Sequence, residues 1–432
     1  MRQAQMRANT LFVMFSVCLL MQRVSCFDFH VAPMQGYTNF ALRHLLQELS
    51  CSSPSIVLWT EMEKVPDLLD ADAAALERRF GAPGKKSIVL QVGGNDPLKM
   101  GRCMQHLSAH GYSFSEINLN AGCPSIESGG AATFGASLMK QPELTRDLLS
   151  VMKDHCNIEL PSTEISLKCR IAVLEAPDDI EAPFTEEQYE RLIQYVHLAH
   201  QGGISHLVLH ARAAVLSGLS PTKNRQAPRL DYSVVERLAR DFPTLRVTMN
   251  GGISGLSQFN QLVKNLPENN ISSLMAGRWM LRRPLDLALV KDCIEGGSER
   301  SKDSTASQSV FKAVENYTKF VRYCINDSKS KQTHLPTLQD LALPMFMISE
   351  QLREDYERVD DDDNNTPRLE VTDMEDIYDT ITETIQWVET FRGSKPTKFS
   401  PTSIQFNKLN SSFKSLVGTK VANKWKRNRS EL

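Results

Sequence analysis

Two glycine-containing motifs late in the sequence have the composition of a phosphate-binding site. They are Asn250-Gly251-Gly252 and Ala276-Gly277-Arg278, and each follows a short apolar run. Glycines leave backbone N–H groups uncovered by side chains, and successive uncovered N–H groups can form a concave site for an anion. Because glycine pairs also occur as ordinary turns, the phosphate interpretation and the turn interpretation are equally open from these motifs alone.

Two cationic residues alternate with a cysteine in the middle of the chain. In an extended strand, Lys168 and Arg170 point to one face and Cys169 points to the other. A lysine in the interior of a fold is costly without an anionic partner. We therefore predict that Lys168 and Arg170 reach one cavity and that Cys169 packs in the core.

These residues belong to a pattern of eight regularly spaced apolar runs. The runs cover residues 29–34, 56–62, 88–93, 116–122, 165–170, 206–212, 246–252 and 273–278. Amphipathic stretches of helical period lie between them, for example at residues 39–50, 97–111, 185–201 and 232–242. Strand-like runs that alternate with helical stretches are typical of βα units. Eight such units predict an α/β fold, a TIM (β/α)8 barrel.

Polar or small residues follow almost every run. TIM-barrel active sites form at the carboxyl ends of the strands, so we expect these residues to surround one site. The set is Pro33, Met34, Glu61, Gln91, Asn120, Cys123, Lys168, Arg170, His210, Arg212, Asn250, Gly251, Gly252, Gly277 and Arg278.

The rest of the chain predicts a second, helical unit. The length of 432 residues allows one large and one smaller domain, and 41% hydrophobic with 23% charged residues is ordinary for a globular protein. Helical apolar periods occur at residues 310–325, 338–357 and 374–391. We predict a barrel domain at residues 28–298 and a C-terminal helical domain at residues 299–432, with a solvated acidic insertion near residues 358–370.

The N-terminus resembles a targeting segment. Arg2 and Arg7 precede an apolar run at residues 11–21, which is shorter than the roughly 20 residues of a membrane span. We expect residues 1–27 to be a targeting-like or disordered segment, with no stable membrane association. The compartment is left open between the cytoplasm and an organelle such as a plastid or mitochondrion.

Cysteine spacing and net charge limit the possible ligands. The nine cysteines lack a paired metal-ligand spacing, so we expect no metal site and a reducing compartment. The net charge is only -2, so affinity for a polyanion would come from local clusters. One cluster is the C-terminal tail, where Lys424, Lys426 and Arg427 flank Trp425. Such a tail can bind phosphates and stack on a base, although basic termini also serve solubility.

A series of motifs, in order along residues 29 to 290, resembles the tRNA-dihydrouridine synthases. The segment from Gly218 to Tyr232 resembles the bacterial A-type subfamily in particular. The motifs are Val31-Ala-Pro-Met34, Thr60-Glu-Met62, Leu90-Gln-Val-Gly-Gly94, Glu116-Ile-Asn-Leu-Asn-Ala-Gly-Cys-Pro-Ser125, Phe134-Gly-Ala136, Lys168-Cys-Arg170, His210-Ala-Arg212, Gly218-Leu-Ser-Pro221, Asn224-Arg225, Leu230-Asp-Tyr232, Asn250-Gly-Gly252 and Gly277-Arg278.

The resemblance implies a flavin-dependent oxidoreductase. Such an enzyme uses FMN and NADPH to reduce uridine to 5,6-dihydrouridine in the D-loop of tRNA, here at positions 20/20a. The hydride passes from flavin N5 to C6 of uracil, and Cys123 supplies the proton to C5. A thiol suits this role because it is mostly protonated at neutral pH. The competing interpretation of Cys123 is a small buried hydrophobic residue.

The resemblance also assigns the remaining site residues. The cofactor set is Ala32, Pro33, Met34, Gln91, Lys168, His210, Asn250, Gly251, Gly252, Gly277 and Arg278, with the charge of Lys168 near flavin N1 and O2. The uracil and tRNA set is Asn120, Arg170, Arg212 and Arg225, to which the basic tail adds Lys426 and Arg427. Exposed arginines are equally often plain solvated charges. The partner is tRNA, bound by a monomer whose helical domain contacts the RNA.

Two other functions and three departures from the family pattern stay open. An FMN barrel dehydrogenase of a free pyrimidine would not need a basic helical tail. A catalytically inactive tRNA-binding homologue would not need Cys123 and Lys168. Glu127 replaces a usual basic residue, Ala172 a glycine and Thr222 a lysine, so the modified uridine is not fixed by the sequence.

Overall fold

The computed structural model describes residues 27–124, 134–177, 180–220, 222–295, 305–331, 336–357, 371–391 and 406–417. Three predictions therefore lie outside the described residues. They concern the targeting-like segment up to residue 26, the acidic insertion near residues 358–370, and the basic tail with Lys426 and Arg427.

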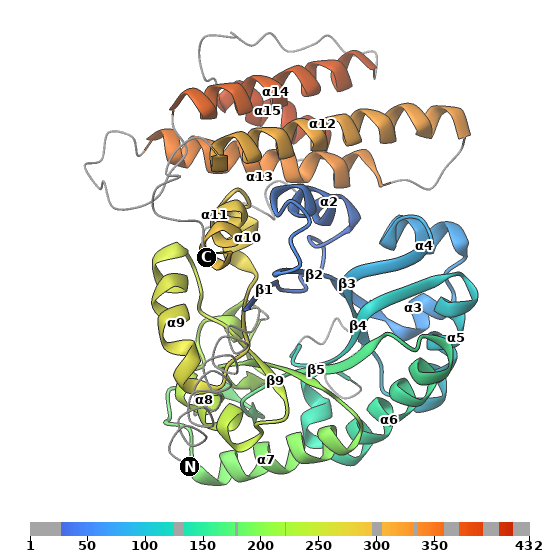
Figure 1. The fold of residues 1–432 in the computed structure, drawn as a ribbon, viewed down its shortest axis with the longest axis vertical. Coiled ribbons are helices and arrows are strands. Elements are labelled where there is room, and N and C mark those ends of the chain that lie inside the picture. The colour runs from blue at the N-terminus through green and yellow to red at the C-terminus, as the bar shows by residue number, and fades with distance from the viewer. Residues whose placement is uncertain are drawn as a thin grey trace, which may run out of the picture.

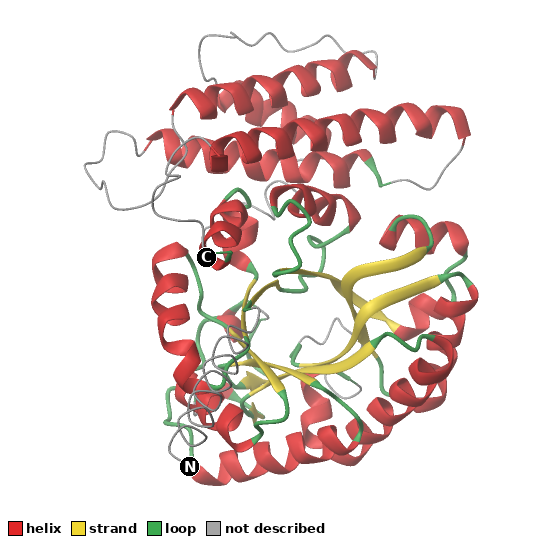
Figure 2. Cartoon of the chain, viewed as in Figure 1, coloured by secondary structure: helices red, strands yellow, loops and turns green. Residues whose placement is uncertain are grey.

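Eight parallel strands close into a barrel, which confirms the predicted fold (Figures 1 and 2). Around the barrel the order is β1, β10, β9, β7, β5, β4, β3 and β2. The strands are β1 (Asp28–Val31), β2 (Ile56–Lys64), β3 (Gly84–Gly93), β4 (Tyr112–Ala121), β5 (Glu164–Arg170), β7 (His206–His210), β9 (Arg246–Asn250) and β10 (Ser273–Ala276).

Side-chain alternation sets the two faces of each strand. On β5, Cys169 is fully buried in the main hydrophobic core together with Ile165 and Leu167. Lys168 and Arg170 point to the opposite face, because successive side chains alternate along a strand. The predicted orientation of Cys169 away from the cavity is confirmed.

The barrel interior has a polar layer near the amino ends of the strands. A ring nitrogen of His206 lies 3.0 Å from each carboxylate oxygen of Glu116, and its other nitrogen lies 2.7 Å from Thr248 Oγ1. Burial alone would raise the pKa of Glu116, but the charge and hydrogen bonds of His206, helped by a hydrogen bond from Ser166, hold that pKa below its ordinary value. The charges of this layer are therefore balanced within the barrel.

Helices surround the barrel, and their first turns show why they begin where they do. At the start of α7, Thr185 Oγ1 accepts from the Gln188 N–H (3.2 Å) and Gln188 Oε1 accepts from the Thr185 N–H (3.0 Å), a capping box. The helices are α2 (Phe40–Leu49), α3 (Val65–Leu69), α4 (Ala73–Phe80), α5 (Pro97–Ala109), α6 (Pro142–Glu159), α7 (Glu186–Gln201), α8 (Tyr232–Asp241), α9 (Leu256–Asn269), α10 (Arg278–Arg282) and α11 (Asp286–Ile294).

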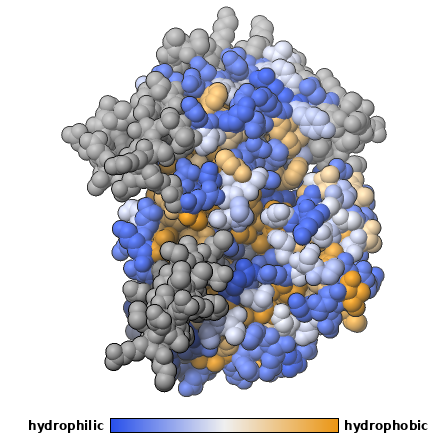
Figure 3. Space-filling model, in the orientation of Figure 1, coloured by the Kyte–Doolittle hydropathy of each residue, from blue (hydrophilic) through white to orange (hydrophobic). Residues whose placement is uncertain are grey.

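Four C-terminal helices pack on one side of the barrel (Figure 1). They are α12 (Thr305–Lys331), α13 (Leu338–Glu357), α14 (Val371–Phe391) and α15 (Phe406–Val417). Three of them match the predicted helical periods, and the fourth, α15, was not predicted. Arg283 after α10 pairs with Asp355 of α13 at 2.7 Å, and Asn39 before α2 donates to Asp340 of α13 at 3.1 Å. Where the helical side is coloured in Figure 3, polar residues prevail, and hydrophobic residues are visible between it and the barrel. None of the described helices is both long and apolar enough to cross a membrane.

Candidate active site

The Asn250-Gly251-Gly252 turn after β9 requires both of its glycines. Gly251 has φ +113° and Gly252 has φ +75°, a backbone region that favours glycine. A Cβ on Gly251 would lie 2.5 Å from Cδ2 of His210, and a Cβ on Gly252 would lie 2.5 Å from Cδ2 of Leu230. The turn is therefore packed tightly against the end of β7, more closely than a plain surface turn requires.

The ends of β1 and β10 also meet closely. The Ala32 N–H donates to the Ala276 carbonyl at 2.8 Å, which extends the strand pairing beyond β1. A Cβ on Gly277 would lie 3.0 Å from Sδ of Met34 and 3.2 Å from Cβ of Ala32. Ala32, Met34 and Gly277 thus converge at the barrel mouth, and Pro33 lies between the first two.

Lys168 projects from the end of β5 toward the end of β9. Its Nζ donates to Asn250 Oδ1 at 2.9 Å, and Asn250 Nδ2 in turn donates to the Met275 carbonyl at 2.9 Å. Burial, reinforced by the positive charge of Arg170, lowers the pKa of Lys168 to about 7. The ammonium is therefore poorly stabilised by the protein and would gain from a bound anion.

Further cations surround Lys168 without carboxylate partners. Burial lowers the pKa of Arg170 to about 9; Cys123 opposes this shift and nearby arginines reinforce it. Burial and the neighbouring cations also hold the pKa of His210 well below its ordinary value. Among the residues that the structure describes, ion pairs to a carboxylate are absent from Lys168, Arg170, Arg212 and Arg278. An uncompensated positive cluster of this kind is suited to a phosphate.

Arg170 joins three loops of the mouth. It is buried, its Nε donates to the Gly122 carbonyl at 3.1 Å, and its Nη1 donates to the carbonyls of Ala213 and Asn224, each at 3.1 Å. Its Nη2 makes no hydrogen bond to the described part of the chain. The Nε and Nη1 groups of Arg170 thus hold the loops together, while its Nη2 N–H groups can bind a ligand.

Cys123 lies in the loop directly after β4, and its backbone is held from both sides. Asn120 Oδ1 accepts from the N–H groups of Gly122 and Cys123, both at 3.1 Å. On the other side, the Cys123 carbonyl accepts from the Ala136 N–H at 2.9 Å. Cys123 is only partly buried, and it lies close enough to Lys168 and Arg170 to influence their pKa values.

Gln91 supports this loop from below. Its Oε1 accepts from Asn120 Nδ2 at 2.8 Å, and its backbone N–H donates to Thr60 Oγ1 at 3.1 Å. The amide of Asn118 lies 2.9 Å from that of Gln91. The sequence analysis assigned no role to Thr60 or Asn118, although Asn118 shares a strand face with Asn120 and could have been found by that alternation.

The long loop after β7 carries the two predicted rim arginines. Arg212 Nη1 donates to the Gln226 carbonyl at 3.1 Å and to the Pro228 carbonyl, and Arg278 Nη2 donates to the Arg225 carbonyl at 3.4 Å. Two short strands, β6 (Val173–Leu174) and β8 (Ala214–Val215), pair beside this loop.

Asn224 is a loop residue whose role the sequence analysis missed. It is buried, its Oδ1 accepts from the Val215 N–H at 2.8 Å, and its Nδ2 donates to the Val215 carbonyl at 2.7 Å. Its own carbonyl accepts from Arg170. Asn224 therefore fixes the loop segment that presents Arg225.

The structure brings most predicted site residues to one end of the barrel. Glu61, also in the expected set, lies on β2 and lines a cavity that neither Cys123 nor Lys168 lines. Arg212 and Arg225 lie in the neighbouring loop, and no group of three or more potential metal ligands occurs in the described segments. The ligand contacts themselves stay predictions. The residues at the mouth are Ala32, Pro33, Met34, Gln91, Asn120, Cys123, Lys168, Arg170, His210, Asn250, Gly251, Gly252, Gly277 and Arg278.

The known proteins and the family model to which this chain is similar are all described as dihydrouridine synthases. The family model described as dihydrouridine synthase (Dus) matches residues 30–381. A tRNA-dihydrouridine(20/20a) synthase of Pasteurella multocida is 34% identical over 268 residues, 62% of this chain and 72% of that protein. The enzymes of the same name from Escherichia coli K12 and Synechocystis are each 34% identical, over 281 and 262 residues. These two matches cover 64% and 60% of this chain and 72% and 70% of the relatives.

Proposed function

This chain belongs to the dihydrouridine synthase family, and we propose that it reduces uridine in tRNA to 5,6-dihydrouridine with FMN and NADPH. The names of its relatives support positions 20 and 20a as the targets. One observation carries the proposal: a partly exposed cysteine, a partly buried lysine and two glycine turns share one end of the barrel.

The chemistry of the mouth fits a phosphorylated flavin. Arg278 and the N–H groups beside Gly251, Gly252 and Gly277 suit the phosphate, and Lys168 suits a ring that becomes anionic on reduction. Ala32, Pro33, Met34, Gln91, His210 and Asn250 complete the binding set. When bound there, FMN would take reducing equivalents from NADPH and supply the hydride that reaches C6 of uracil.

Cys123 would hold the proton that uracil C5 receives. Asn120 Oδ1 accepts from the N–H groups of Gly122 and Cys123, so the backbone that carries the thiol is held in place before the substrate arrives. The free Nη2 of Arg170 can donate to a uracil carbonyl, because its other nitrogens already hold the surrounding loops. Asn120 and Arg170 would thus orient the base for proton transfer from Cys123.

The tRNA must present its uridine outside the base stack. Enzymes that act on one base of a folded nucleic acid bind it extruded in a pocket. Arg212 and Arg225 lie on the loop beside the mouth, where they can contact tRNA phosphates near the extruded uridine. Lys426 and Arg427 in the C-terminal tail would extend this contact.

A purified preparation tests the proposal. We expect a flavin absorption spectrum, and dihydrouridine detected by mass spectrometry after incubation with NADPH and unmodified tRNA. Cys123→Ala should slow the reaction by about 10² to 10⁴, the range for a general acid. Cys293→Ala, at an exposed cysteine outside the mouth, is the matched control and should have no effect.

Two outcomes would support the other functions. Turnover of free uracil or orotate, without reduction of tRNA, would indicate a dehydrogenase of free pyrimidines. A colourless protein that binds tRNA and that added FMN does not restore would indicate an inactive homologue.

A further inference from the structure

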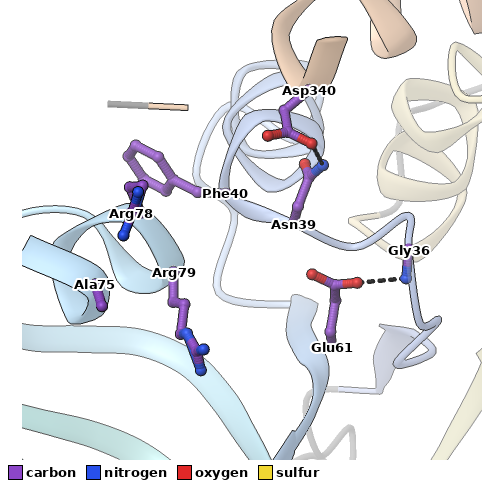
Figure 4. A pocket seen from close by; sticks show the side chains of 8 residues that line it. All are labelled: Gly36, Asn39, Phe40, Glu61, Ala75, Arg78, Arg79 and Asp340. Carbon is purple, nitrogen blue, oxygen red and sulfur yellow. Dashed lines mark hydrogen bonds between the residues drawn. The ribbon is translucent and has the colours of Figure 1, made fainter. Parts of the chain in front are cut away.

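A separate cavity lies between the barrel and the helical domain. It has a volume of about 290 Å³ and is lined by residues that include Gly36, Asn39, Phe40, Glu61, Arg78 and Asp340 (Figure 4). Small-molecule sites begin at roughly 300 Å³, so the cavity is close to that lower limit and has room for the base of a nucleotide rather than for all of it. Neither Cys123 nor the cation cluster of the mouth lines it.

Glu61 provides an acceptor in this cavity. One of its oxygens, Oε1, accepts from the Gly36 N–H, and the other makes no hydrogen bond to the described residues. Burial raises the pKa of Glu61. Each carboxylate oxygen can accept two hydrogen bonds, so Glu61 keeps capacity for a ligand that carries N–H donors.

Asp340 and Asn39 hold the two domains together at the edge of the cavity. Asp340 Oδ1 accepts from Asn39 Nδ2 at 3.1 Å, and Asp340 Oδ2 accepts from the Thr337 N–H at 3.2 Å. The Thr337 hydroxyl also donates to Oδ2, at 2.6 Å, so Asp340 Oδ2 is fully used and Asp340 serves mainly to hold this contact. The cavity wall is therefore built by residues about three hundred positions apart in the sequence.

The remaining walls offer an aromatic ring and a cation. In Figure 4, Phe40 and Arg78 lie together across the cavity from Glu61. Arg79 pairs with Glu63 at 3.0 Å, whereas exposed Arg78 has neither an ion pair nor a hydrogen bond within the described segments. The Phe40 ring already makes T-shaped contacts with His44 and Phe320 and is partly buried, so only its remaining exposed part can contact a base. An aromatic ring can stack on a base and an unpaired arginine can bind a phosphate.

We propose that this cavity binds a guanine nucleotide of the tRNA substrate, distinct from the uridine that is reduced. Guanine presents N1–H and an amino group side by side, which matches the carboxylate of Glu61, while Phe40 can stack on the base and Arg78 can hold its phosphate. Uracil presents a single N–H between two carbonyls. Its carbonyl oxygens would lie next to the carboxylate oxygens of Glu61 and repel them, because both are acceptors. The inference rests on the proposed function, because base-extruding enzymes also contact nucleotides near their target.

Nucleotide binding to the FMN-loaded protein tests the cavity without the redox reaction. We expect GMP to bind with Kd near 1 mM and inosine monophosphate, which lacks the amino group, to bind about tenfold more weakly. Glu61→Gln keeps an acceptor for the Gly36 N–H but replaces the free oxygen with a donor. In this variant the preference for GMP over inosine monophosphate should disappear.

Two arginine variants test the phosphate contact. Arg78→Ala should weaken GMP binding several-fold and leave guanosine binding unchanged. Arg102→Ala, which removes an exposed arginine of α5 away from the cavity, should leave both unchanged. In steady-state assays with tRNA, Arg78→Ala should raise KM without changing kcat.

The cavity inference and the proposed function can fail separately. Equal binding of GMP and inosine monophosphate, tighter binding of CMP or UMP, or displacement of GMP by NADP⁺ would overturn the guanine site. An unchanged KM for tRNA in both Glu61→Gln and Arg78→Ala would overturn its role in tRNA binding, even with normal dihydrouridine formation. Selective GMP binding in a protein that forms no dihydrouridine would instead overturn the proposed dihydrouridine synthase function, while the assignment of the cavity as a guanine site would stand.

Discussion

The two ends of the barrel interior differ in whether their charged side chains have partners of opposite charge. Near the amino ends of the strands, Glu116 lies 3.0 Å from His206 and 3.6 Å from Arg246, so its charge is matched within the protein. Near the carboxyl ends, Lys168 and Arg170 have only neutral oxygens as hydrogen-bond partners among the described residues. The charge at the amino end is therefore balanced by protein groups, whereas the described residues supply no anion to balance the cations at the carboxyl end.

This difference separates stability from function within one set of strands. A matched buried charge is strongly destabilising when its partner is removed. An unmatched buried charge already costs stability in the free protein, and proteins accept such a cost mainly at functional sites. Mutations at the two ends should thus affect different measurements.

The largest expected effect is loss of stability at the amino end. Glu116→Ala removes the carboxylate that faces His206 and leaves Ser166 without its acceptor. The free energy of unfolding should fall by about 3 to 5 kcal/mol, as for other broken buried pairs. Urea unfolding measures this, and Glu164→Ala, which removes an exposed partner of Arg246, should cost under about 1 kcal/mol. Equal losses in both variants would remove the distinction between the two ends.

At the carboxyl end, removing the charge of Lys168 should reduce the pH dependence of the free energy of unfolding. The pKa of Lys168 is lowered from 10.5 to about 7, so between these values the unfolded chain binds more protons than the folded one. Stability of the flavin-free protein should therefore rise with pH, by at most on the order of 1 kcal/mol per pH unit. Lys168→Met should lose this rise in urea unfolding between pH 7 and pH 9, compared directly with the unmutated protein.

Bound FMN sharpens the same experiment. A phosphate or an anionic ring near Lys168 would raise its pKa, so saturating FMN should reduce the pH slope of the unmutated protein. FMN should bind the Lys168→Met variant more weakly. Parallel pH curves for the two flavin-free proteins would contradict the assignment of Lys168 as an unmatched charge.

The sequence was sufficient for those parts of the structure that depend on local pattern. Strand and helix periods are local, so the eight strands and the helices at 310–325, 338–357 and 374–391 could be predicted. Alternation along one strand placed Cys169 in the core and Lys168 on the opposite face. The β3 and β4 strands begin earlier than predicted, because residues such as Lys85 and Lys86 form strand pairs despite an unfavourable composition.

Contacts between distant segments were not predictable in this way. Lys168 meets Asn250 across 82 positions, and Asn39 meets Asp340 across 301 positions. These contacts depend on how loops and domains pack, which no periodicity encodes. For the same reason Asn224 was quoted only as part of a motif, and its bonds to Val215 became visible only in the folded loop.

A smaller effect is expected at the glycine turn of the carboxyl end. Gly251→Ala places a side chain at φ +113°, with its Cβ 2.5 Å from the ring of His210. The strain should cost about 2 kcal/mol of unfolding free energy and displace His210, so FMN affinity measured by fluorescence should fall. Gly255→Ala, where a Cβ meets open space and φ is extended, is the matched control. Normal FMN affinity in Gly251→Ala would show that this turn does not shape the site.

The smallest expected effect lies in the loop that borders the carboxyl end. Asn224→Ala removes both hydrogen bonds to Val215 and should cost about 1 to 2 kcal/mol. Because Arg225 follows directly, the loop should loosen around Arg225, whereas Arg278 keeps its place in α10. We expect a higher KM for tRNA with nearly unchanged FMN affinity, since the flavin set comes from other strands. A drop in FMN affinity as large as that of Gly251→Ala would instead show that this loop is part of the anion site. The cluster of unpaired cations at the carboxyl end would then include the loop after β7.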